Sequence, residues 1–375
     1  MMKRTMQCEN ANREETQQMI AQLAPGYYVH KADAISDLGG LLNQVGYRRT
    51  LIISGVRSYQ SAQTAIEETL NKHQIPWKLC QYGGECSDHE AERILGEQGR
   101  RWDVVVGVGG GKVIDLSKLV AWRLSVPLVT IPTVVSNCAA TTSNAVVYDG
   151  QGRVKESRLG LVPPLWALVD DTVLSRSPQR YLVSGLGDTL AKPYEARIGA
   201  RGESVLEVSA LSIATLAVDG IARRGVEGLQ AMDQAIVNPV LSDLIDAVVL
   251  LGSLVGGIGG NLLRGAVAHA LHNALTGLPE LHHTLHGEKV AYGLMVQETV
   301  VGRSRNEILE LRGVLSPLGL PVNWATLAGQ ATLPNRSVLR EVAEKTLASP
   351  LMDGKLPGLS VDHFVDAIRQ VEDYC

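Results

Sequence analysis

The histidines of this chain are concentrated in one short segment. Five of its nine histidines lie between residues 269 and 286, at His269, His272, His282, His283 and His286. Neutral imidazole is a strong ligand for zinc and iron, and a metal with few protein ligands keeps a coordination position open for a substrate oxygen. The segment therefore predicts a metal centre at which chemistry takes place.

A second candidate site is the glycine-rich loop that begins at Gly107 and reads Gly-Val-Gly-Gly-Gly-Lys-Val. It follows a predicted strand and begins a predicted helix, where a dinucleotide pyrophosphate is expected, because glycines let the backbone approach the phosphates and the helix N-terminus favours their charge. Lys112 and Asp115 are expected to assist. The loop is neither a G-x-G-x-x-G fingerprint nor a P-loop, so a tight structural turn is the alternative interpretation.

The elements that must position these residues alternate between strand and helix over about residues 48 to 170. Apolar, β-branched runs predict the strands, and amphipathic spacing predicts the helices. The strands are predicted at 50–55, 77–81, 103–107 and 127–131, and the helices at 59–74, 87–98 and 113–123. This alternation predicts a parallel sheet covered on both faces. The pair Asp149 and Gly150 predicts the tight turn of a hairpin over 144–156.

Beyond Asp171 the pattern changes to helical segments rich in Ala, Leu and Val, with few strand signals. The length of 375 residues also exceeds the size at which one hydrophobic core usually stops growing. We therefore predict two domains. An α/β dinucleotide-binding domain with a parallel sheet spans 1–171, and an all-α metal-binding domain spans 172–375.

Composition narrows the class of partner. The net charge of −4, without a basic run, gives no electrostatic footprint for nucleic acid, and no uninterrupted apolar run is long enough to predict a membrane span. The polar start, Met1 to Asn10, does not resemble a secretion signal. Five scattered cysteines without a C-x-x-C pair indicate reduced thiols. These features predict a cytoplasmic protein whose partner is a small molecule.

Four motifs in order carry a resemblance to a known family. They are the glycine loop, Ile131-Pro132-Thr133, the run Gly185-Leu-Gly-Asp-Thr-Leu-Ala191, and the histidine segment. With these motifs the chain resembles the metal-dependent alcohol dehydrogenases of the glycerol dehydrogenase type, from about residue 25 to its end. The resemblance implies the architecture shared with dehydroquinate synthases, an active site in the cleft between the two domains, and a homo-oligomer.

The resemblance also assigns residues. It implies a metal bound by Asp188, His269 and His286, a donor set that suits Zn²⁺. His272 is expected in a proton path or behind the ligands, whereas His282 and His283 are expected to pack or to support the ligands. The implied cofactor contacts are Gly109, Gly110, Gly111, Lys112, Val113, Thr133, Val134, Val135, Ser136, Thr142, Asn144 and Tyr148.

The first departure from the family concerns the cofactor. NAD-specific relatives end the first strand with an acidic residue for the adenosine ribose, but the sequence from Gly55 to Tyr59 carries none and has Arg57 instead. A guanidinium can hold a 2′-phosphate by paired, charged hydrogen bonds. NADP(H) is therefore the predicted cofactor, and NAD(H) is the alternative if Arg57 is an ordinary surface residue.

The second departure concerns the substrate. Cys138 occupies the position at which glycerol-oxidising relatives place an aspartate for a polyol hydroxyl, and a thiol is a poor replacement for that acceptor. Arg264 adds a cation that can pair with a substrate carboxylate or form a salt bridge inside the helical domain. Pro193, five positions after Asp188, is expected to interrupt and bend its helix.

These departures predict reduction of a small 2-oxo acid to a 2-hydroxy acid with NADPH, with Cys138, Arg264 and His272 as the residues around the reacting groups. NAD-dependent oxidation of glycerol or a related diol is the first alternative. A lyase of the dehydroquinate synthase type is a weaker one, because that glycine loop continues differently after Gly111. A relic that only binds metal or cofactor is the remaining alternative, and the intact Asp188, His269 and His286 argue against it.

Overall fold

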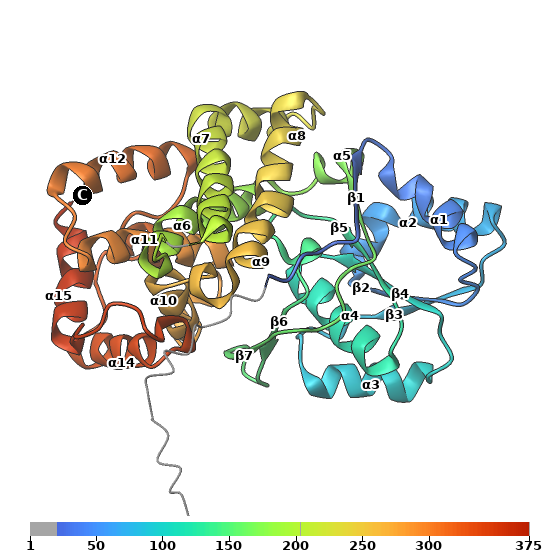
Figure 1. The fold of residues 1–375 in the computed structure, drawn as a ribbon, viewed down its shortest axis with the longest axis horizontal. Helices are drawn as coiled ribbons and strands as arrows, with labels where there is room; N and C mark the ends of the chain where they lie inside the picture. The colour runs from blue at the N-terminus through green and yellow to red at the C-terminus, as the bar shows by residue number, and fades with distance from the viewer. Residues whose placement is uncertain (1–20, 203, 375) are drawn as a thin grey trace, which may run out of the picture.

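The computed structural model describes residues 21–202 and 204–374. A lobe built around a sheet and a lobe built from helices lie side by side, joined near Asp171 (Figure 1). Cys80, Cys86 and Cys138 carry free thiols. Cys8, Cys375 and the start of the chain, for which expectations were given above, lie outside the described residues.

The first lobe contains the predicted parallel sheet, with six strands in the order β1-β8-β5-β4-β2-β3. All four strands predicted from the sequence are present, with ends within two residues of those expected. The outer parts of the sheet add β1 and β8, which the sequence analysis did not single out. The strands are β1 (Tyr27–Lys31), β2 (Thr50–Ser54), β3 (Trp77–Gln81), β4 (Val104–Gly109), β5 (Leu128–Pro132) and β8 (Trp166–Asp170).

Alternating side chains of the central strands belong to two separate cores. Val104 and Val106 pack in a cluster with α1 and α2, whereas Val105 packs in a cluster with α3 and α4. Successive strand residues point to opposite faces, so each face of the sheet is covered by its own pair of helices. These helices are α1 (Leu38–Gln44), α2 (Val56–Lys72), α3 (Asp88–Gln98) and α4 (Gly111–Leu124).

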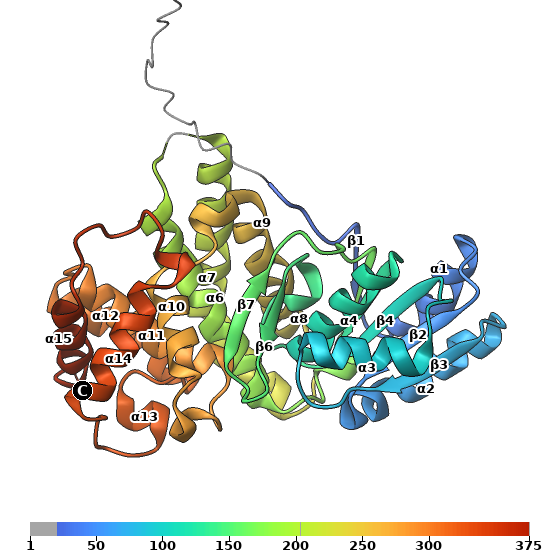
Figure 2. The ribbon, with the colours of Figure 1, turned by 90° about the horizontal axis from the view of Figure 1, so that it is seen from below.

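The predicted hairpin is present as two antiparallel strands, β6 (Ala145–Tyr148) and β7 (Val154–Arg158). It lies apart from the main sheet and between the two lobes (Figure 2). Asp149 stabilises the turn by accepting hydrogen bonds from the backbone N–H groups of Gln151 and Arg153.

The second lobe is helical, as predicted, and no strand follows β8 in the described part of the chain. The boundary between 171 and 172 stays a proposal. The helices of this lobe that matter below are α6 (Gln179–Gly199), α7 (Val205–Asp233), α8 (Pro239–Asp246), α9 (Gly252–Leu263), α10 (Val267–Leu275) and α11 (His286–Val300). The remaining helices include α5 (Asp171–Leu174), α12 (Arg305–Leu315), α13 (Trp324–Ala328), α14 (Arg336–Leu347) and α15 (Val361–Glu372). The expectation that Pro193 interrupts its helix is wrong, because α6 continues through it.

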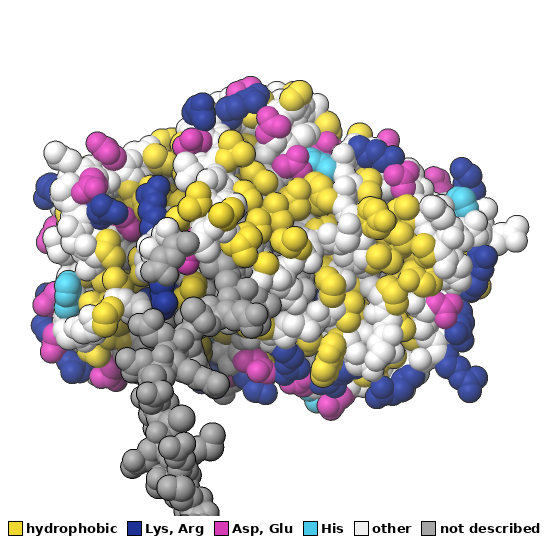
Figure 3. Space-filling model, viewed as in Figure 1, with side chains coloured by type: hydrophobic (Ala, Val, Ile, Leu, Met, Phe, Trp, Pro, Cys, Tyr) yellow, Lys and Arg dark blue, Asp and Glu magenta, His cyan; other side chains and the backbone are white. Residues whose placement is uncertain are grey.

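Two helical stretches of this lobe are long and apolar enough to cross a membrane, judged by length and composition alone. In the stretch Pro239–Leu263, 61 % of the most apolar window is buried, as in a core helix; in α7 the share is 28 %. Apolar side chains gather on the surface over α7 and α9 (Figure 3). Core helices of water-soluble proteins pass the same test, so these stretches are weak evidence for a membrane span.

A buried histidine ties the two lobes together. His30, on β1, lies 2.7 Å from Asp171 Oδ1 through Nε2 and 2.7 Å from Asp246 Oδ1 through Nδ1. Tyr28 donates to the same Asp246 oxygen at 2.6 Å, and Ser242 donates to Asp171. Burial alone would lower the pKa of His30, but its hydrogen bonds to the two carboxylates raise this pKa to about 9.

This bridge predicts a pH-dependent contribution to stability. A raised folded-state pKa stabilises the fold fully below the ordinary histidine pKa of 6.5 and loses that effect as the pH rises through about 9. We expect His30→Gln to lower the free energy of unfolding by on the order of 2 kcal/mol at pH 6. The difference from the wild type should shrink by pH 10 in urea unfolding.

The exposed His363 provides the control. His363→Gln should leave the free energy of unfolding close to that of the wild type at every pH. A constant difference between His30→Gln and the wild type from pH 6 to 10 would contradict a charged bridge.

Candidate active site

The candidate metal site depends on a close contact between α6 and α11. A Cβ atom added to Gly287 would lie 1.6 Å from the Ser184 carbonyl oxygen, and one added to Gly187 would lie 2.5 Å from the Gly287 carbonyl oxygen. No side chain fits in either place. The Gly287 N–H donates to Ser184 Oγ at 3.0 Å across this contact. The two backbones therefore touch at the level of Asp188 and His286.

The structure brings together Asp188, His269 and His286, and one donor atom from each lies within 4.8 Å of the others. Asp188 Oδ1 is 3.0 Å from His269 Nε2 and 3.5 Å from His286 Nε2. Donors of a tetrahedral zinc site with bonds of about 2.1 Å are separated by about 3.4 Å. One carboxylate and two imidazoles at these separations fit a divalent metal of the zinc or iron type.

Glu195 fixes the orientation of His269. Its Oε2 atom accepts a hydrogen bond from His269 Nδ1 at 2.5 Å, and its Oε1 atom accepts from the backbone N–H groups of Ala266 and His269. With the proton on Nδ1, the Nε2 lone pair is left for a metal. Burial would lower the pKa of His269, but the Glu195 and Asp188 carboxylates together raise this pKa. The sequence analysis missed Glu195, whose signal was its position seven residues after Asp188 on the same helix face.

His272 supports the other imidazole ligand. His286 Nδ1 lies 3.0 Å from His272 Nε2, and His272 Nδ1 lies 2.9 Å from Asn273 Oδ1. This chain of contacts leaves His286 Nε2 facing Asp188. Both ring nitrogens of His272 are engaged, and burial holds its pKa well below the usual range. Its place behind a ligand is therefore observed, whereas its role in a proton path stays a prediction.

The other two histidines of the segment do not support the ligands through their side chains. His282 and His283 are exposed, so the expectation that they pack or support the ligands is wrong. The backbone carbonyl of His283 accepts a hydrogen bond from Arg180, which also pairs with Glu288 at 2.7 Å. These contacts hold the start of α11.

A buried lysine, also missed from the sequence, contacts two of the three metal-site residues. Lys192 lies one turn after Asp188 on α6, and its Nζ atom is 2.8 Å from Asp188 Oδ1 and 3.3 Å from His269 Nε2. Burial works against ionisation of Asp188, but Lys192 and the two histidines lower its pKa well below the usual range. The i, i+4 spacing of Asp188 and Lys192 was the available signal.

The glycine loop lies at the carboxyl edge of the sheet, where β4 ends and α4 begins after Gly110. The neighbouring strand β2 ends beside it, and Arg57 lies in the first turn of the helix that follows β2. From β2 the chain adds β3 on one side and then β4 on the other, so the order of strands reverses between β2 and β4. Open α/β sheets bind dinucleotides at such a point. Arg57 is exposed, and no carboxylate is present from Gly55 to Tyr59.

Several expected cofactor residues surround this loop. Lys112 pairs with Glu85 at 2.5 Å and lies 4.6 Å from the centre of the Tyr148 ring. Thr133 follows β5 and donates its backbone N–H to the Gly109 carbonyl at 3.2 Å. Gly110 approaches Val134 so closely that an added Cβ would lie 3.1 Å from that side chain. The loops after β4 and β5 thus lie against each other, as a shared cofactor cradle requires.

Other expected residues of this region have structural partners. Asp115 accepts hydrogen bonds from buried Lys118 at 2.8 Å and from the backbone N–H of Val146 at 2.9 Å, so the expectation that it assists the phosphates is wrong. Lys118 also donates to Thr142 Oγ1 at 3.0 Å and to the Asn144 carbonyl at 2.7 Å. The sequence analysis missed Lys118, which holds these two predicted cofactor residues in place.

The remaining expected cofactor residues include both side chains buried in the cores and a half-buried side chain on a loop. Val113 is buried between Gly109 and the α4 core, and Val135 is buried in the core of the helical lobe, so their side chains pack. Ser136 is half-buried on the loop that follows β5. The contacts implied for Val113 and Val135 would therefore involve their backbones.

Cys138 and Arg264 lie near each other in the same region. Burial raises the pKa of the Cys138 thiol, and the charges of Lys192 and Asp188 also act on it. Both side chains pack against α9, where a Cβ added to Gly252 would lie 3.6 Å from Cys138 Cβ and one added to Gly256, one turn later, would lie 3.3 Å from Arg264 Cγ. Its Nη2 atom lies 3.5 Å from the Gly256 carbonyl, and its buried Nη1 atom has no hydrogen-bond partner among the described residues. The salt bridge considered for Arg264 within the helical domain is absent from the described part of the chain.

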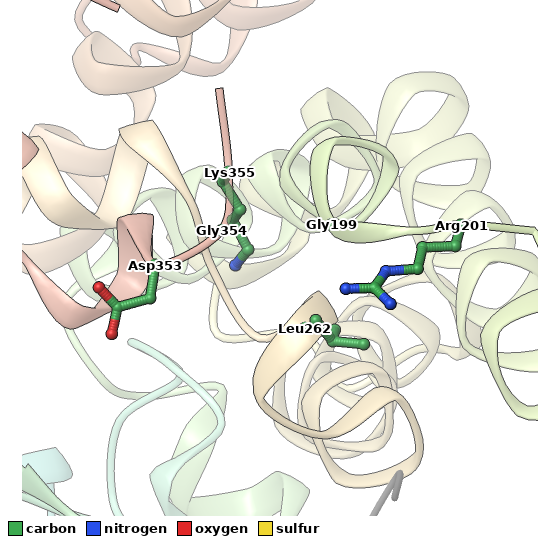
Figure 4. A pocket seen from close by; sticks show the side chains of 6 residues that line it. All are labelled: Gly199, Arg201, Leu262, Asp353, Gly354 and Lys355. Carbon is green, nitrogen blue, oxygen red and sulfur yellow. The ribbon is translucent and has the colours of Figure 1, made fainter. Parts of the chain in front are cut away.

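A cavity of about 240 Å³ lies at the end of α6, outside this cluster (Figure 4). Arg201, Asp353 and Lys355 contribute its charged lining. Lys355 donates to the Gly265 carbonyl and so braces the loop between Arg264 and α10. The cavity contains none of the residues assigned to metal or cofactor.

Comparison with known proteins agrees with this geometry. A family model described as iron-containing alcohol dehydrogenase matches residues 29–178. The chain is 32 % identical to a glycerol dehydrogenase of Pseudomonas putida over 89 % of its own length and 92 % of that protein. It is 30 % identical to hydroxycarboxylate dehydrogenase A of Escherichia coli strain K12, covering 94 % and 97 %. A crystal structure of a probable glycerol dehydrogenase from Sinorhizobium meliloti superposes with a TM-score of 0.82 at 28 % identity, covering 95 % and 98 %.

The chain therefore belongs to the iron-containing alcohol dehydrogenase family, and its relatives include glycerol and hydroxycarboxylate dehydrogenases. It is an oxidoreductase with an α/β lobe and a helical lobe, as the sequence predicted.

The contact between Glu195 and His269 predicts a loss of metal affinity in Glu195→Gln. An amide cannot supply the negative charge that holds the Nδ1 proton, so the dissociation constant for Zn²⁺ should rise about 10- to 100-fold. A competition titration with a chromophoric chelator measures this. Glu298→Gln, which alters a buried carboxylate on α11 away from the ligands, is the control and should bind Zn²⁺ as the wild type does. Equal affinities for wild type and Glu195→Gln would exclude the proposed role of Glu195.

Proposed function

We propose that the protein interconverts a small 2-oxo acid and the corresponding 2-hydroxy acid with a nicotinamide cofactor. The observation that carries this proposal is Arg264, a largely buried guanidinium with no carboxylate partner in the described chain. A buried, unpaired charge is costly, and a substrate carboxylate would offset that cost. Cys138 adds no negative charge beside it, because burial raises the pKa of the thiol.

Different residues of the site would bind the metal, orient its ligands and orient the cofactor. Asp188, His269 and His286 would hold the divalent metal, which when bound supplies a Lewis acid for the oxygen of the reacting carbon. Glu195 keeps the proton of His269 on Nδ1, and His272 keeps His286 turned toward Asp188. The glycine loop and the loop after β5 would orient the nicotinamide cofactor at the cleft.

We propose NADP(H) as the preferred cofactor. Arg57 lies at the N-terminal end of α2, beside the glycine loop, without an ion-pair partner in the described chain. Its guanidinium and the helix N-terminus would both favour a 2′-phosphate. NAD(H) is the alternative. A homo-oligomer in the cytoplasm is a further proposal, and the apolar surface over α7 supports association between copies.

Oxidation of glycerol or a related diol is the second candidate function. The observation that favours it is the similarity to a glycerol dehydrogenase at 32 % identity, slightly above the similarity to the hydroxycarboxylate enzyme. Both relatives match nearly the whole chain at similar identity. The two candidates therefore differ in the substrate pocket, where Cys138 and Arg264 lie.

Steady-state kinetics with a panel of 2-oxo acids, dihydroxyacetone and simple aldehydes test the proposed function. We expect the highest kcat/KM for a 2-oxo acid. Arg264→Met should reduce that value about 10- to 100-fold, mainly through KM, because a charged hydrogen bond to the substrate is lost, and should change the value for dihydroxyacetone little. Arg197→Met, which alters an exposed arginine of α6, is the control. Preference of the wild type for dihydroxyacetone or glycerol would favour the second candidate.

The cofactor proposal has its own test in Arg57→Ala. Loss of the guanidinium should raise KM for NADPH at least 10-fold and leave KM for NADH nearly unchanged, because only NADPH carries the 2′-phosphate. Arg48→Ala removes another exposed arginine of the same lobe and should have no such effect. An unchanged KM for NADPH in Arg57→Ala would remove Arg57 from the cofactor site.

A further inference from the structure

Lys192 is a buried cation whose hydrogen-bond partners, among the described residues, belong to the candidate metal site. Only 7 % of the residue is exposed. The two hydrogen-bond partners of Nζ are Asp188 Oδ1, at 2.8 Å, and His269 Nε2, at 3.3 Å. These are the same two atoms that lie 3.0 Å from each other in the ligand set.

Nζ and these two atoms form a nearly equilateral triangle with sides of 2.8, 3.0 and 3.3 Å. A divalent metal would need the lone pairs of Asp188 Oδ1 and His269 Nε2, which now face the ammonium. It would also repel a positive charge at so short a distance. Lys192 and a metal therefore compete for the same two donors.

The neighbouring anions offer Lys192 little compensation. Glu195 is the closest further carboxylate by sequence, but its two oxygens already accept hydrogen bonds from His269 Nδ1 and from two backbone N–H groups. Cys138 lies within range of the Lys192 charge, but burial keeps it a neutral thiol. A buried ammonium that gives up its partners requires another anion, because an unpaired buried charge is strongly unfavourable.

Arg264 is a second cation near the site, and Cys138 lies between it and Lys192 in the chain of contacts. The charge of Lys192 acts on the Cys138 thiol, and Cys138 and Arg264 pack against Gly252 and Gly256, one turn apart on α9. Arg264 Nη1 is buried without a partner among the described residues. Lys192 and Arg264 thus lie near the uncharged Cys138, and Lys192 is also beside the metal ligands. This arrangement suits an anion that also reaches the metal. A 2-oxo acid has this shape, with its carboxylate adjacent to the carbonyl.

We propose that Lys192 is a specificity-determining residue that binds the substrate carboxylate, together with Arg264, when Asp188 and His269 bind metal. This inference rests on the proposed function, because it assumes an anionic substrate. Lys192 leaves the metal donors and pairs with the carboxylate, so the substrate anion and the metal occupy the site together.

The test compares pyruvate with butane-2,3-dione, which has nearly the same shape and no charge. In the Zn²⁺-loaded wild type, kcat/KM should favour pyruvate. In Lys192→Met the ratio of the two kcat/KM values should fall about 10- to 100-fold, because only pyruvate loses a charged hydrogen bond. Lys192→Arg should restore at least part of the ratio. Lys345→Met, which removes an exposed lysine of α14 that pairs with Glu341, should leave the ratio unchanged.

Two measurements that do not depend on turnover complete the test. Oxamate, an unreactive analogue of a 2-oxo acid, should bind the metal-loaded wild type in calorimetry at least 10-fold more tightly than it binds Lys192→Met. Zn²⁺ should bind Lys192→Met more tightly than it binds the wild type, because the competing ammonium is absent.

The outcomes separate the two proposals. A wild type that prefers butane-2,3-dione or dihydroxyacetone over every 2-oxo acid overturns the proposed function. A wild type that prefers pyruvate, with the same ratio and the same oxamate affinity in Lys192→Met, overturns the role of Lys192 and leaves it as a structural partner of Asp188. If Lys192→Met does not fold, Lys192→Arg decides by the oxamate affinity: retention of at least a tenth of the wild-type affinity supports the proposal, and complete loss contradicts it.

Discussion

The close packing of α6 against α11 is the constraint on which the rest of the site depends. Gly187 and Gly287 let the two backbones approach to a distance that no side chain would permit. The same approach places Asp188 on one helix opposite His286 on the other, 3.5 Å apart at their donor atoms. Helix α10 joins them in a similar way, because a Cβ on Gly293 of α11 would lie 2.7 Å from the Ala268 carbonyl, next to His269. Glycines at these helix contacts thus bring α6, α10 and α11 close enough for their three side chains to form one ligand set.

Charge balance decides how that ligand set behaves. The carboxylates of Asp188 and Glu195 are buried on one face of α6. Lys192 follows Asp188 by four residues on that face, and Glu195 follows it by seven. Burying a carboxylate is unfavourable unless it is paired. Glu195 meets this requirement with a permanent partner, His269, whereas Asp188 has Lys192, a partner that a metal can replace. One helix face therefore contains a carboxylate with a fixed hydrogen-bond partner beside a carboxylate with an exchangeable one.

The predictions from sequence were most accurate where a residue's role follows from its local pattern. The strands 50–54 and 77–81 were identifiable because short β-branched runs separate amphipathic helices, and the ligand set followed from motifs in a known order. Local spacing could place Glu195 on the face of Asp188 and Asp115 beside Lys118, but it could not supply their distant partners, which are Ala266 for Glu195 and Val146 for Asp115. Pro193 was misjudged because the packing of α6 outweighs the loss of one backbone donor.

Residues that hold the metal and residues that select the substrate lie in different kinds of structure. Metal ligands are held by helix-to-helix contacts that leave no room for variation, so relatives with different substrates can share them. Cys138 follows a strand on a short loop, and Arg264 lies between two helices, so both positions can change without moving Asp188, His269 or His286. Lys192 is the exception, because it lies on the scaffold helix itself and still carries a charge into the pocket. A change at Lys192 would alter metal affinity and substrate charge preference together, which makes it the point where the metal site and the choice of substrate are coupled.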